Sequence, residues 1–165
     1  MGKRVRWGIM ASGVIAHKFA EGLKALEDAV HFAVGSRSLD KATDFARQYG
    51  MERAYGSYEE LAADPDVDII YVATPHPYHY DSAMMCLKAG KAVLCEKPFT
   101  LNSKETGKVI DYAREKGLFL MEAMWTRYLP AAAGFTTPEK TKIERIMFHK
   151  WFSGGKYKLL SCKGC

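Results

Sequence analysis

Short apolar stretches alternate with amphipathic stretches through most of the chain. The apolar stretches have the length of buried strands, and they predict strands at residues 5–10, 31–34, 54–55, 69–73, between Gly90 and Glu96, and at 118–121. The amphipathic stretches predict five helices. The first ends near Leu26, the next three span residues 39–48, 58–63 and 78–89, and the last lies between Asn102 and Gly117. Regular alternation of strands and helices predicts an α/β fold with a doubly wound, Rossmann-type parallel sheet.

Several helix boundaries have recognisable signals. Ser57 with Glu60, and Asn102 with Glu105, have the spacing of capping boxes at helix starts. Gly117 has the place of a glycine that ends a helix. These positions support the predicted division into helices and strands.

The length of the chain suits one domain and part of another, because 165 residues can bury one substantial core. No apolar run approaches the roughly 20 residues of a membrane-spanning helix. Residues 1–6 lead directly into a strand instead of into the core of a signal peptide. We therefore expect a cytoplasmic protein without membrane association.

The net charge of +5 is confined to one end of the sequence. Residues 1–137 carry 17 basic and 17 acidic side chains, whereas residues 138–165 carry 7 and 2. A short basic tail without a recognised binding motif is typical of a solvated helix face, so we expect no nucleic-acid partner.

The four cysteines, at positions 86, 95, 162 and 165, have neither the spacing of a zinc site nor that of a secreted disulfide framework. Cys86 and Cys95 fall in predicted core elements, where a free cysteine behaves as a small hydrophobic residue. Cys162 and Cys165 form a single pair at the end of the chain, and we attribute their spacing to chance. No metal site is expected.

The turn after the first predicted strand resembles a dinucleotide-binding fingerprint. The segment Ala11-Ser12-Gly13-Val14-Ile15-Ala16 fits A-x-G-x-x-A, in which Gly13 has the position of closest approach to a pyrophosphate and Ala11 replaces the usual first glycine. The motif alone is weak. Its context, a strand before and an amphipathic helix after, is the one that phosphate binding at a helix N-terminus requires.

The residues after the second predicted strand favour NADP over NAD. An acidic residue there would bind the two ribose hydroxyls of NAD, and none is present in Gly35-Ser36-Arg37-Ser38. Ser36, Arg37 and Lys41 instead offer hydrogen-bond donors and positive charge for a 2′-phosphate. The alternative is an ordinary basic loop.

Two further polar segments follow buried strands, where parallel sheets collect their ligands. They are Thr74-Pro75 and Glu96-Lys97-Pro98. A lysine held at a strand end beside a bound ligand is suited to proton transfer, because partial desolvation lowers its pKa. The alternative for Lys97 is a solvated lysine at the end of a strand.

Four segments carry a resemblance to a known family: WGIMASGVIA, GSR, AYGSYEELAADPDVDIIYVATPHPYHYDSAMMCLKAGKAVLCEKP and LFLMEAMWTRYLP. Together they resemble the amino-terminal domain of the glucose-fructose oxidoreductase and inositol dehydrogenase (Gfo/Idh/MocA) family, in its dihydrodiol and NADP-dependent xylose dehydrogenase branch. The resemblance extends from about Arg4 to Pro130. The ordered series of TPxxxH, AGK and EKP is far more specific than the fingerprint.

The resemblance implies roles for individual residues. Lys97 would be the active-site lysine that reaches the nicotinamide ribose and the substrate, with a cis Lys97–Pro98 bond. His79 would be a second catalytic residue, or alternatively a helix N-terminal histidine without a substrate role. Trp125 would wall the nicotinamide pocket, or alternatively belong to the core. The residues implied to contact the cofactor are Ala11, Ser12, Gly13, Val14, Ile15, Ser36, Arg37, Lys41, Thr74, Pro75, His76, Glu96, Lys97, Trp125 and Arg127.

The resemblance also implies an activity and a domain division. Residues 1–130 would form the NAD(P)-binding domain, and residues 131–165 a linker helix from Thr137 and the first strand, 157–161, of a second domain that binds substrate and pairs subunits in full-length relatives. We expect a truncated NADP-dependent oxidoreductase for a sugar, polyol or vicinal diol, whose efficient catalysis needs the rest of that domain. The alternative is an NADP-binding module without turnover.

Overall fold

The computed structural model describes residues 4–124, which form a sheet with helices on both faces. The strands are β1 (Val5–Met10), β2 (Ala29–Gly35), β3 (Arg53–Tyr55), β4 (Ile69–Val72), β5 (Ala92–Glu96) and β6 (Leu120–Ala123). The helices are α1 (Val14–Leu23), α2 (Leu39–Tyr49), α3 (Tyr58–Ala63), α4 (His79–Lys88) and α5 (Ser103–Lys116), with a 3₁₀ turn η1 (His76–Tyr78) before α4.

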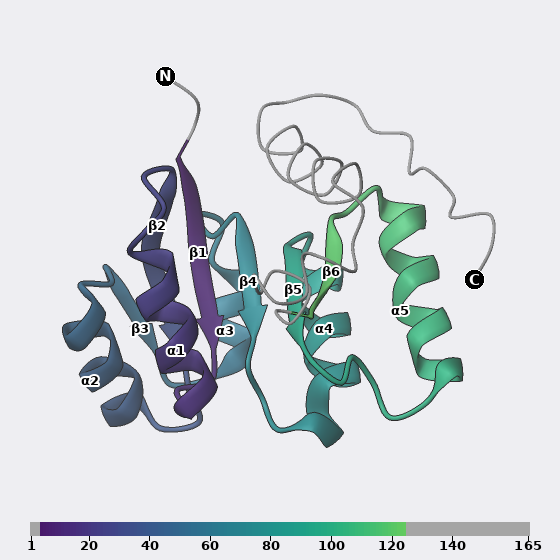
Figure 1. The fold of residues 1–165 in the computed structure, drawn as a ribbon, viewed down its shortest axis with the longest axis horizontal. Helices are drawn as coiled ribbons and strands as arrows, with labels where there is room; N and C mark the ends of the chain where they lie inside the picture. Colours follow the sequence, from purple (N-terminus) through teal and green to yellow (C-terminus); the bar gives the residue numbers. More distant parts are fainter. Residues whose placement is uncertain (1–3, 125–165) are drawn as a thin grey trace, which may run out of the picture. The chain divides into compact units, whose positions relative to one another are not determined.

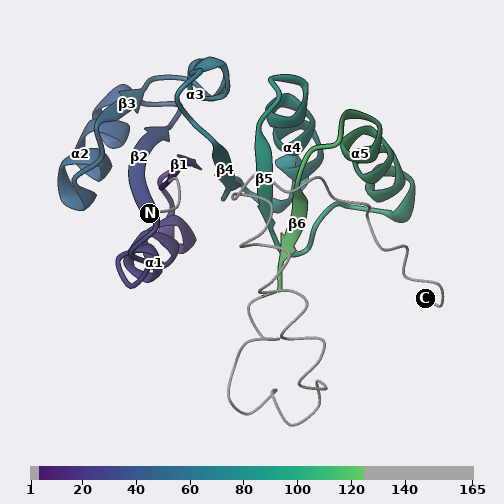
Figure 2. The same ribbon diagram turned by 90° about the horizontal axis from the view of Figure 1, so that it is seen from above.

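All strand pairs in the described sheet are parallel, and the strand order is β3-β2-β1-β4-β5-β6 (Figure 1). Helices α1 and α2 cover one face, and α3, α4 and α5 cover the other (Figure 2). The predicted doubly wound fold is confirmed. The order reverses between β1 and β4, which makes the carboxyl ends of these two strands the expected place for a ligand.

The central strands are apolar because both of their faces are covered. Every residue of β4 is buried, and β1 has a single partly exposed residue. At the end of β2 the helix α3 lies so near that only glycine fits. A Cβ on Gly35 would stand 2.9 Å from the Leu61 Cβ and 3.0 Å from the Ser57 carbonyl oxygen.

The predicted helix signals are confirmed where they can be compared. Ser57 accepts a hydrogen bond from the Glu60 amide at 3.2 Å, and Asn102 accepts one from the Glu105 amide at 3.0 Å. Gly117 ends α5 in the left-handed conformation.

Several boundaries differ from prediction by a few residues. Helix α1 ends at Leu23 instead of near Leu26, and β2 begins at Ala29 instead of His31. Two further differences concern α4 and β6.

The first of these two differences is at α4, which begins at His79 after a 3₁₀ turn instead of at Tyr78. Residues 76–78 form the 3₁₀ turn instead, in which the Tyr78 amide donates to the Pro75 carbonyl oxygen at 2.9 Å. The second is at β6, which begins at Leu120 instead of Leu118. The Leu118 amide still donates to the Ala113 carbonyl at 2.9 Å, so this residue belongs to the end of α5.

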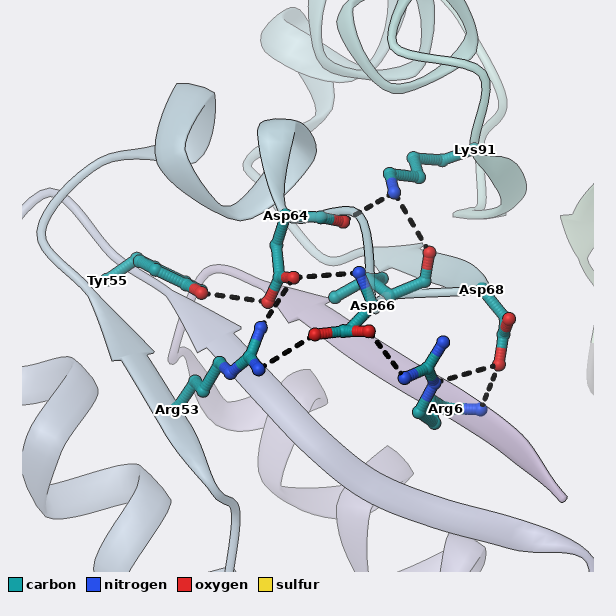
Figure 3. Close-up of polar contacts among 8 residues, drawn as sticks. Arg6, Arg53, Tyr55, Asp64, Asp66, Asp68 and Lys91 are labelled. Carbon is teal, nitrogen blue, oxygen red and sulfur yellow. Dashed lines mark hydrogen bonds and ion pairs between the residues drawn. The ribbon is translucent and has the colours of Figure 1, made fainter.

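A polar network fastens the turn between α3 and β4 at the amino ends of the strands (Figure 3). Asp64 is buried and accepts hydrogen bonds from Arg53 at 2.7 Å, Tyr55 at 2.8 Å and the Asp66 amide at 2.9 Å. Arg53 also reaches Asp66 at 2.8 Å, and the same carboxylate accepts from Arg6 at 2.8 Å. These residues tie β1 and β3 to the turn.

Lys91 completes this network from the turn before β5 (Figure 3). Its buried ammonium group donates to the carbonyl oxygens of Asp64 at 2.5 Å and Val67 at 3.0 Å. Burial lowers the pKa of Lys91. The network lies at the amino ends of the strands, whereas ligands of parallel sheets bind at the carboxyl ends. We therefore assign a structural role to it.

Some predicted features lie outside the described residues, namely the helix from Thr137, the strand at 157–161, the cysteine pair 162 and 165, Trp125 and Arg127. Within residues 4–124, no helix is long and apolar enough to cross a membrane. Within the same range, no cluster of histidine, cysteine and acidic side chains could hold a metal ion.

Candidate functional site

The turn after β1 has the backbone geometry of a phosphate-binding loop. Ala11 has φ of 80°, a left-handed conformation that the first glycine of the fingerprint normally provides, and its amide donates to the Gly35 carbonyl at 2.8 Å. Gly13 is the N-cap of α1 in an extended conformation, with φ of −82°. The turn therefore aims the first amides of α1 at the carboxyl edge of the sheet.

The N-terminus of α1 is open to a ligand. The Gly13 cap provides no side-chain hydrogen bond, and the first turn of α1 has no acidic residue. Apart from Gly13 and its two chain neighbours, no described residue has an atom within 4 Å of a Cβ built on Gly13, so the space beside this backbone is clear. Uncapped amide hydrogens with clear space before them are the arrangement that binds phosphate.

The ends of β1 and β2 meet through two serines. The Ser12 hydroxyl lies 3.4 Å from the Ser36 hydroxyl, which also accepts a hydrogen bond from the Ser38 amide at 3.4 Å. Ser12 and Lys41 line one hollow of about 170 Å³, together with four other residues. These four are His17, Asp44, Phe45 and Gln48. Two of the predicted cofactor contacts thus share one hollow although they lie on different elements.

Arg37 and Lys41 give this end of the sheet exposed positive charge. Burial raises the pKa of Tyr58 on α3, and the Arg37 guanidinium opposes that rise. No acidic side chain occurs in the segment 35–38 that joins β2 to the cap of α2.

Buried side chains hold the segment after β4 by hydrogen bonds. The Thr74 hydroxyl lies 3.2 Å from the Ser82 hydroxyl of α4, and both residues are buried. His79, the first residue of α4, is 2% exposed. Its Nε2 lies 2.8 Å from the Thr74 carbonyl oxygen and its Nδ1 lies 2.7 Å from the Pro98 carbonyl oxygen. The ring therefore joins the loops that follow β4 and β5.

The loop after β5 is held by one side chain at each of four successive residues. The contacts are Lys97 N to Glu96 Oε2 at 3.0 Å, Pro98 O to His79 Nδ1 at 2.7 Å, Phe99 N to Glu122 Oε1 at 2.9 Å and Thr100 O to His76 Nε2 at 3.1 Å. The side chains come from β5, α4, β6 and η1. A loop whose backbone is fixed in this way presents its side chains in a defined position. The Lys97–Pro98 peptide bond is cis, as the resemblance implies.

Glu96 and Lys97 point to different environments. Glu96 is 6% exposed and accepts a hydrogen bond from the Tyr71 hydroxyl at 2.5 Å. Burial and the Glu96 carboxylate raise the pKa of Tyr71. The Lys97 side chain is exposed among the described residues, in contrast to the partial desolvation that its place after a strand suggests.

The described site residues gather at two places on one edge of the sheet. The turn after β1 meets the end of β2 through Ser12 and Ser36, and the loops after β4 and β5 meet through His79. Tyr71, Ser82 and Glu122 support this edge and were not predicted from the sequence. A hydroxyl or carboxylate within an apolar run is the signal that could have indicated Tyr71 and Glu122, because buried polar groups need partners.

The chain matches one family profile over nearly all of the described residues. The profile is that of the oxidoreductase family with an NAD-binding Rossmann fold, and it matches residues 5–124. The trans-1,2-dihydrobenzene-1,2-diol dehydrogenases of mouse and human are each 48% identical to the chain, over 129 and 130 residues. These matches cover 77% and 78% of this chain but 39% of each relative. The chain thus spans about two fifths of the length of the curated relatives it matches.

Solved structures with the same fold include several oxidoreductases. An NAD-binding oxidoreductase from Klebsiella pneumoniae superposes with a TM-score of 0.75 at 27% identity, covering 89% of this chain and 39% of its own. A 3-ketoreductase from Actinomadura kijaniata, in complex with TDP-benzene and NADP, superposes with a TM-score of 0.73 at 28% identity, covering 89% and 44%. A biliverdin reductase from Synechocystis, in complex with biliverdin and NADP⁺, gives 0.66 at 30% identity, covering 73% and 38%.

Proposed function

The chain belongs to the oxidoreductase family with an NAD-binding Rossmann fold, and from this premise we propose that it binds NADP as a redox cofactor. The observation that carries the proposal is the open N-terminus of α1 next to the basic end of β2. Gly13 leaves room for a pyrophosphate, and Ser36, Arg37 and Lys41 follow at the neighbouring strand.

The preference for NADP over NAD rests on charge. A 2′-phosphate needs donors and cations, whereas a free 2′-hydroxyl is normally bound by a carboxylate at the end of β2. Here the end of β2 carries Ser36 and Arg37, and Lys41 lines the hollow beside Ser12. The solved relatives from Actinomadura kijaniata and Synechocystis were obtained with NADP, which supports the same choice.

The proposed reaction is hydride transfer between the nicotinamide, which supplies the redox chemistry, and a carbon that bears a hydroxyl or carbonyl group. Lys97 would act as the catalytic residue that binds the substrate oxygen and moves its proton, from a loop whose backbone four side chains hold in place. Thr74, Pro75 and His76 would border the cofactor, and Trp125 and Arg127 would contact it from outside the described residues.

The proposed substrate is a sugar, a polyol or a vicinal diol. The relatives of nearly half identity are named for a vicinal diol, trans-1,2-dihydrobenzene-1,2-diol. Because the chain spans about two fifths of their length, we propose that turnover requires contacts equivalent to those of the remaining part. Residues 1–130 would form the cofactor domain, and residues 131–165 would begin the domain that binds substrate and pairs subunits.

A second candidate is a module that binds NADP without turnover. The exposed Lys97 favours it, because a solvent-exposed lysine is less suited to donate a proton than one in a closed site. The two candidates share the cofactor site and differ only in the chemistry that follows.

The test is a titration of NADPH and NADH into the 165-residue chain, with nicotinamide fluorescence and thermal melting followed together. We expect binding selective for NADPH with a rise in melting temperature. Equal binding of both cofactors would refute the NADP preference, and binding of neither would refute the proposed function. Incubation with NADP and a panel of sugars and diols then separates an oxidoreductase from a binding module.

A further inference from the structure

We infer that Tyr71 and Glu96 are positioning residues that link helix α1 to the backbone of Lys97. The link consists of one ring contact and two hydrogen bonds between described residues. The inference about the link stands on these contacts alone, and its consequence for cofactor binding rests on the proposed function.

The register of the sheet brings the two polar side chains together. Tyr71 on β4 pairs with Leu94 on β5, and Glu96 lies two residues further along β5. Because side chains alternate along a strand, Leu94 and Glu96 project to the same face of the sheet as Tyr71. The Tyr71 hydroxyl therefore reaches the Glu96 carboxyl group diagonally across the two strands, at 2.5 Å.

Each end of the link has a defined partner. The Tyr71 ring stacks on the Phe19 ring of α1, with centroids 3.7 Å apart and planes inclined by 13°. Glu96 Oε2 accepts the Lys97 amide at 3.0 Å, while Oε1 engages the Tyr71 hydroxyl. Tyr71 is 1% exposed and Glu96 is 6% exposed, so water has little access to the bond between them. A hydrogen bond shielded from water in this way is strong.

The link does not depend on a charge assigned to Glu96. The Lys97 amide can only donate a hydrogen bond. Burial raises the pKa of Tyr71, so its hydroxyl keeps the proton. Two donors from different elements thus meet the two oxygen atoms of one carboxyl group.

The two ends of the link belong to different parts of the proposed site. Helix α1 presents its open N-terminus to the pyrophosphate, and Lys97 would reach the nicotinamide ribose and the substrate. One buried pair between them sets the position of the Lys97 backbone relative to that helix. Without the Tyr71 hydroxyl, the Glu96 carboxyl group would lack a partner inside the sheet, turn toward water and release the Lys97 amide.

Amide hydrogen exchange in the full chain, followed by NMR, tests the link directly. We expect the Lys97 amide to exchange slowly in the wild type and at least about tenfold faster in Tyr71→Phe. The Phe99 amide is the internal control, because Glu122 on β6 holds it at 2.9 Å in the same loop. Unchanged exchange at Lys97, or an equal rise at Lys97 and Phe99, would overturn the inference.

Tyr55→Phe is the matched control variant. It removes a hydrogen bond of the same kind, from the Tyr55 hydroxyl to the buried Asp64 carboxylate at 2.8 Å, at the opposite edge of the sheet. This variant should lose stability as Tyr71→Phe does, and yet its Lys97 amide should still exchange slowly. Equally fast exchange at Lys97 in both variants would contradict the positioning role, because a general loss of stability would then explain it.

Cofactor binding tests the consequence under conditions where all variants are folded. Tyr71→Phe should bind NADPH about tenfold more weakly and should bind adenosine 2′,5′-bisphosphate, which carries only the adenine half, as the wild type does. Tyr55→Phe should bind both probes normally. Unchanged NADPH binding by Tyr71→Phe, or an equal loss for both probes, contradicts the role. If the wild-type chain binds neither probe, the proposed function fails, while hydrogen exchange still decides whether the link holds Lys97.

Discussion

The hydroxyl of Tyr71 lies 2.5 Å from the Glu96 carboxylate, across the pair of strands β4 and β5. The second oxygen of the same carboxylate accepts the Lys97 amide at 3.0 Å. A buried carboxylate is costly unless donors engage it, so the phenol and the amide together keep Glu96 inside the sheet. Glu96 in turn fixes the first residue of the loop that carries the proposed catalytic lysine.

We predict that Tyr71→Phe lowers the free energy of unfolding by about 1–3 kcal/mol, because it leaves one oxygen of a buried carboxylate without its donor. The phenyl ring can keep its stacking on Phe19, at a centroid distance of 3.7 Å, so the change isolates the hydroxyl. Urea denaturation measures the loss. Tyr78→Phe is the matched control, since Tyr78 is 56% exposed and should change stability by less than about 0.5 kcal/mol. Equal effects of the two variants would contradict this account.

Acid should weaken the network that holds the turn between α3 and β4. Burial raises the pKa of Asp64, but the Asp66 amide, the Tyr55 hydroxyl and the Arg53 guanidinium together bring it below its ordinary value. The Arg53 and Arg6 side chains lower the pKa of Asp66. A carboxyl group with a lowered pKa in the folded state stabilises the fold above its unfolded pKa of about 3.9, and that contribution is lost as the pH falls through the folded value.

Urea denaturation at a series of pH values should therefore show stability falling below about pH 5. The Asp64→Asn variant should be less stable than the wild type at neutral pH, and the difference should shrink as the pH falls, because acid removes the same charge. Asp44→Asn is the control, since Asp44 is exposed and pairs with its helix neighbour Arg47 at 3.2 Å. A difference that stays constant with pH would exclude Asp64 as a source of the acid sensitivity.

The Ala11→Gly substitution should have almost no effect on stability. Alanine at φ of 80° costs about 1–2 kcal/mol, which glycine would avoid, but glycine loses more chain entropy and the buried methyl group. These effects roughly cancel, so thermal melting should change by the equivalent of less than about 0.5 kcal/mol. Ala42→Gly in the buried face of α2 has no such compensation, and it should cost about 1 kcal/mol or more. A cost for Ala11→Gly equal to that of Ala42→Gly would show that the left-handed turn carries no strain.

The sequence was sufficient to predict the helices and strands and to predict at which edge of the sheet the candidate site lies. Strand and helix periodicity, with caps such as Ser57 and Asn102, predicted local structure because these signals act between near neighbours. The parallel order followed from the alternation of strands and helices. Thr74 and Lys97 could therefore be assigned to neighbouring strand ends from the sequence alone.

The connections between distant residues could not be predicted in the same way. His79 contacts carbonyl groups of Thr74 and Pro98 because the pairing of β4 with β5 and the course of two loops bring them together. The pairing of β4 with β5 follows from the alternation of strands and helices, but the course of the two loops has no signal in the local pattern. Likewise, Ala11 replaces the first glycine of the fingerprint, yet its backbone has a positive φ of 80°, and its amide donates to the Gly35 carbonyl oxygen.

Lys41 should decide the choice between cofactors. If its ammonium group binds the 2′-phosphate, Lys41→Ala should weaken NADPH binding about tenfold, the usual worth of one charge-assisted hydrogen bond, and should leave NADH binding unchanged. Fluorescence titration of both cofactors gives the ratio. Lys104→Ala removes an exposed lysine at the start of α5 and serves as the control for net charge. A parallel loss for NADPH and NADH would show that Lys41 does not read the phosphate.

A substitution at Gly13 separates an effect on folding from an effect on cofactor binding most clearly. The Gly13 backbone is extended, with φ of −82° and ψ of 179°, and apart from its two chain neighbours no described residue lies within 4 Å of a Cβ placed on it. Aspartate is also a favoured N-cap residue, so Gly13→Asp should leave the melting temperature unchanged or raise it. The new carboxylate would occupy the space of the pyrophosphate and repel it, so NADPH affinity should fall at least about tenfold.

The matched control for this substitution is Asn102→Asp, which adds the same charge at the N-cap of α5 and keeps the acceptor for the Glu105 amide. It should leave NADPH affinity unchanged even if it alters stability. Wild-type affinity in Gly13→Asp would mean that the cofactor does not approach the N-terminus of α1, and the proposed function would then lose the observation on which it rests. If Gly13→Asp loses both NADPH affinity and the fold, then glycine is required for folding at this position. That outcome would contradict the clear space found around its backbone.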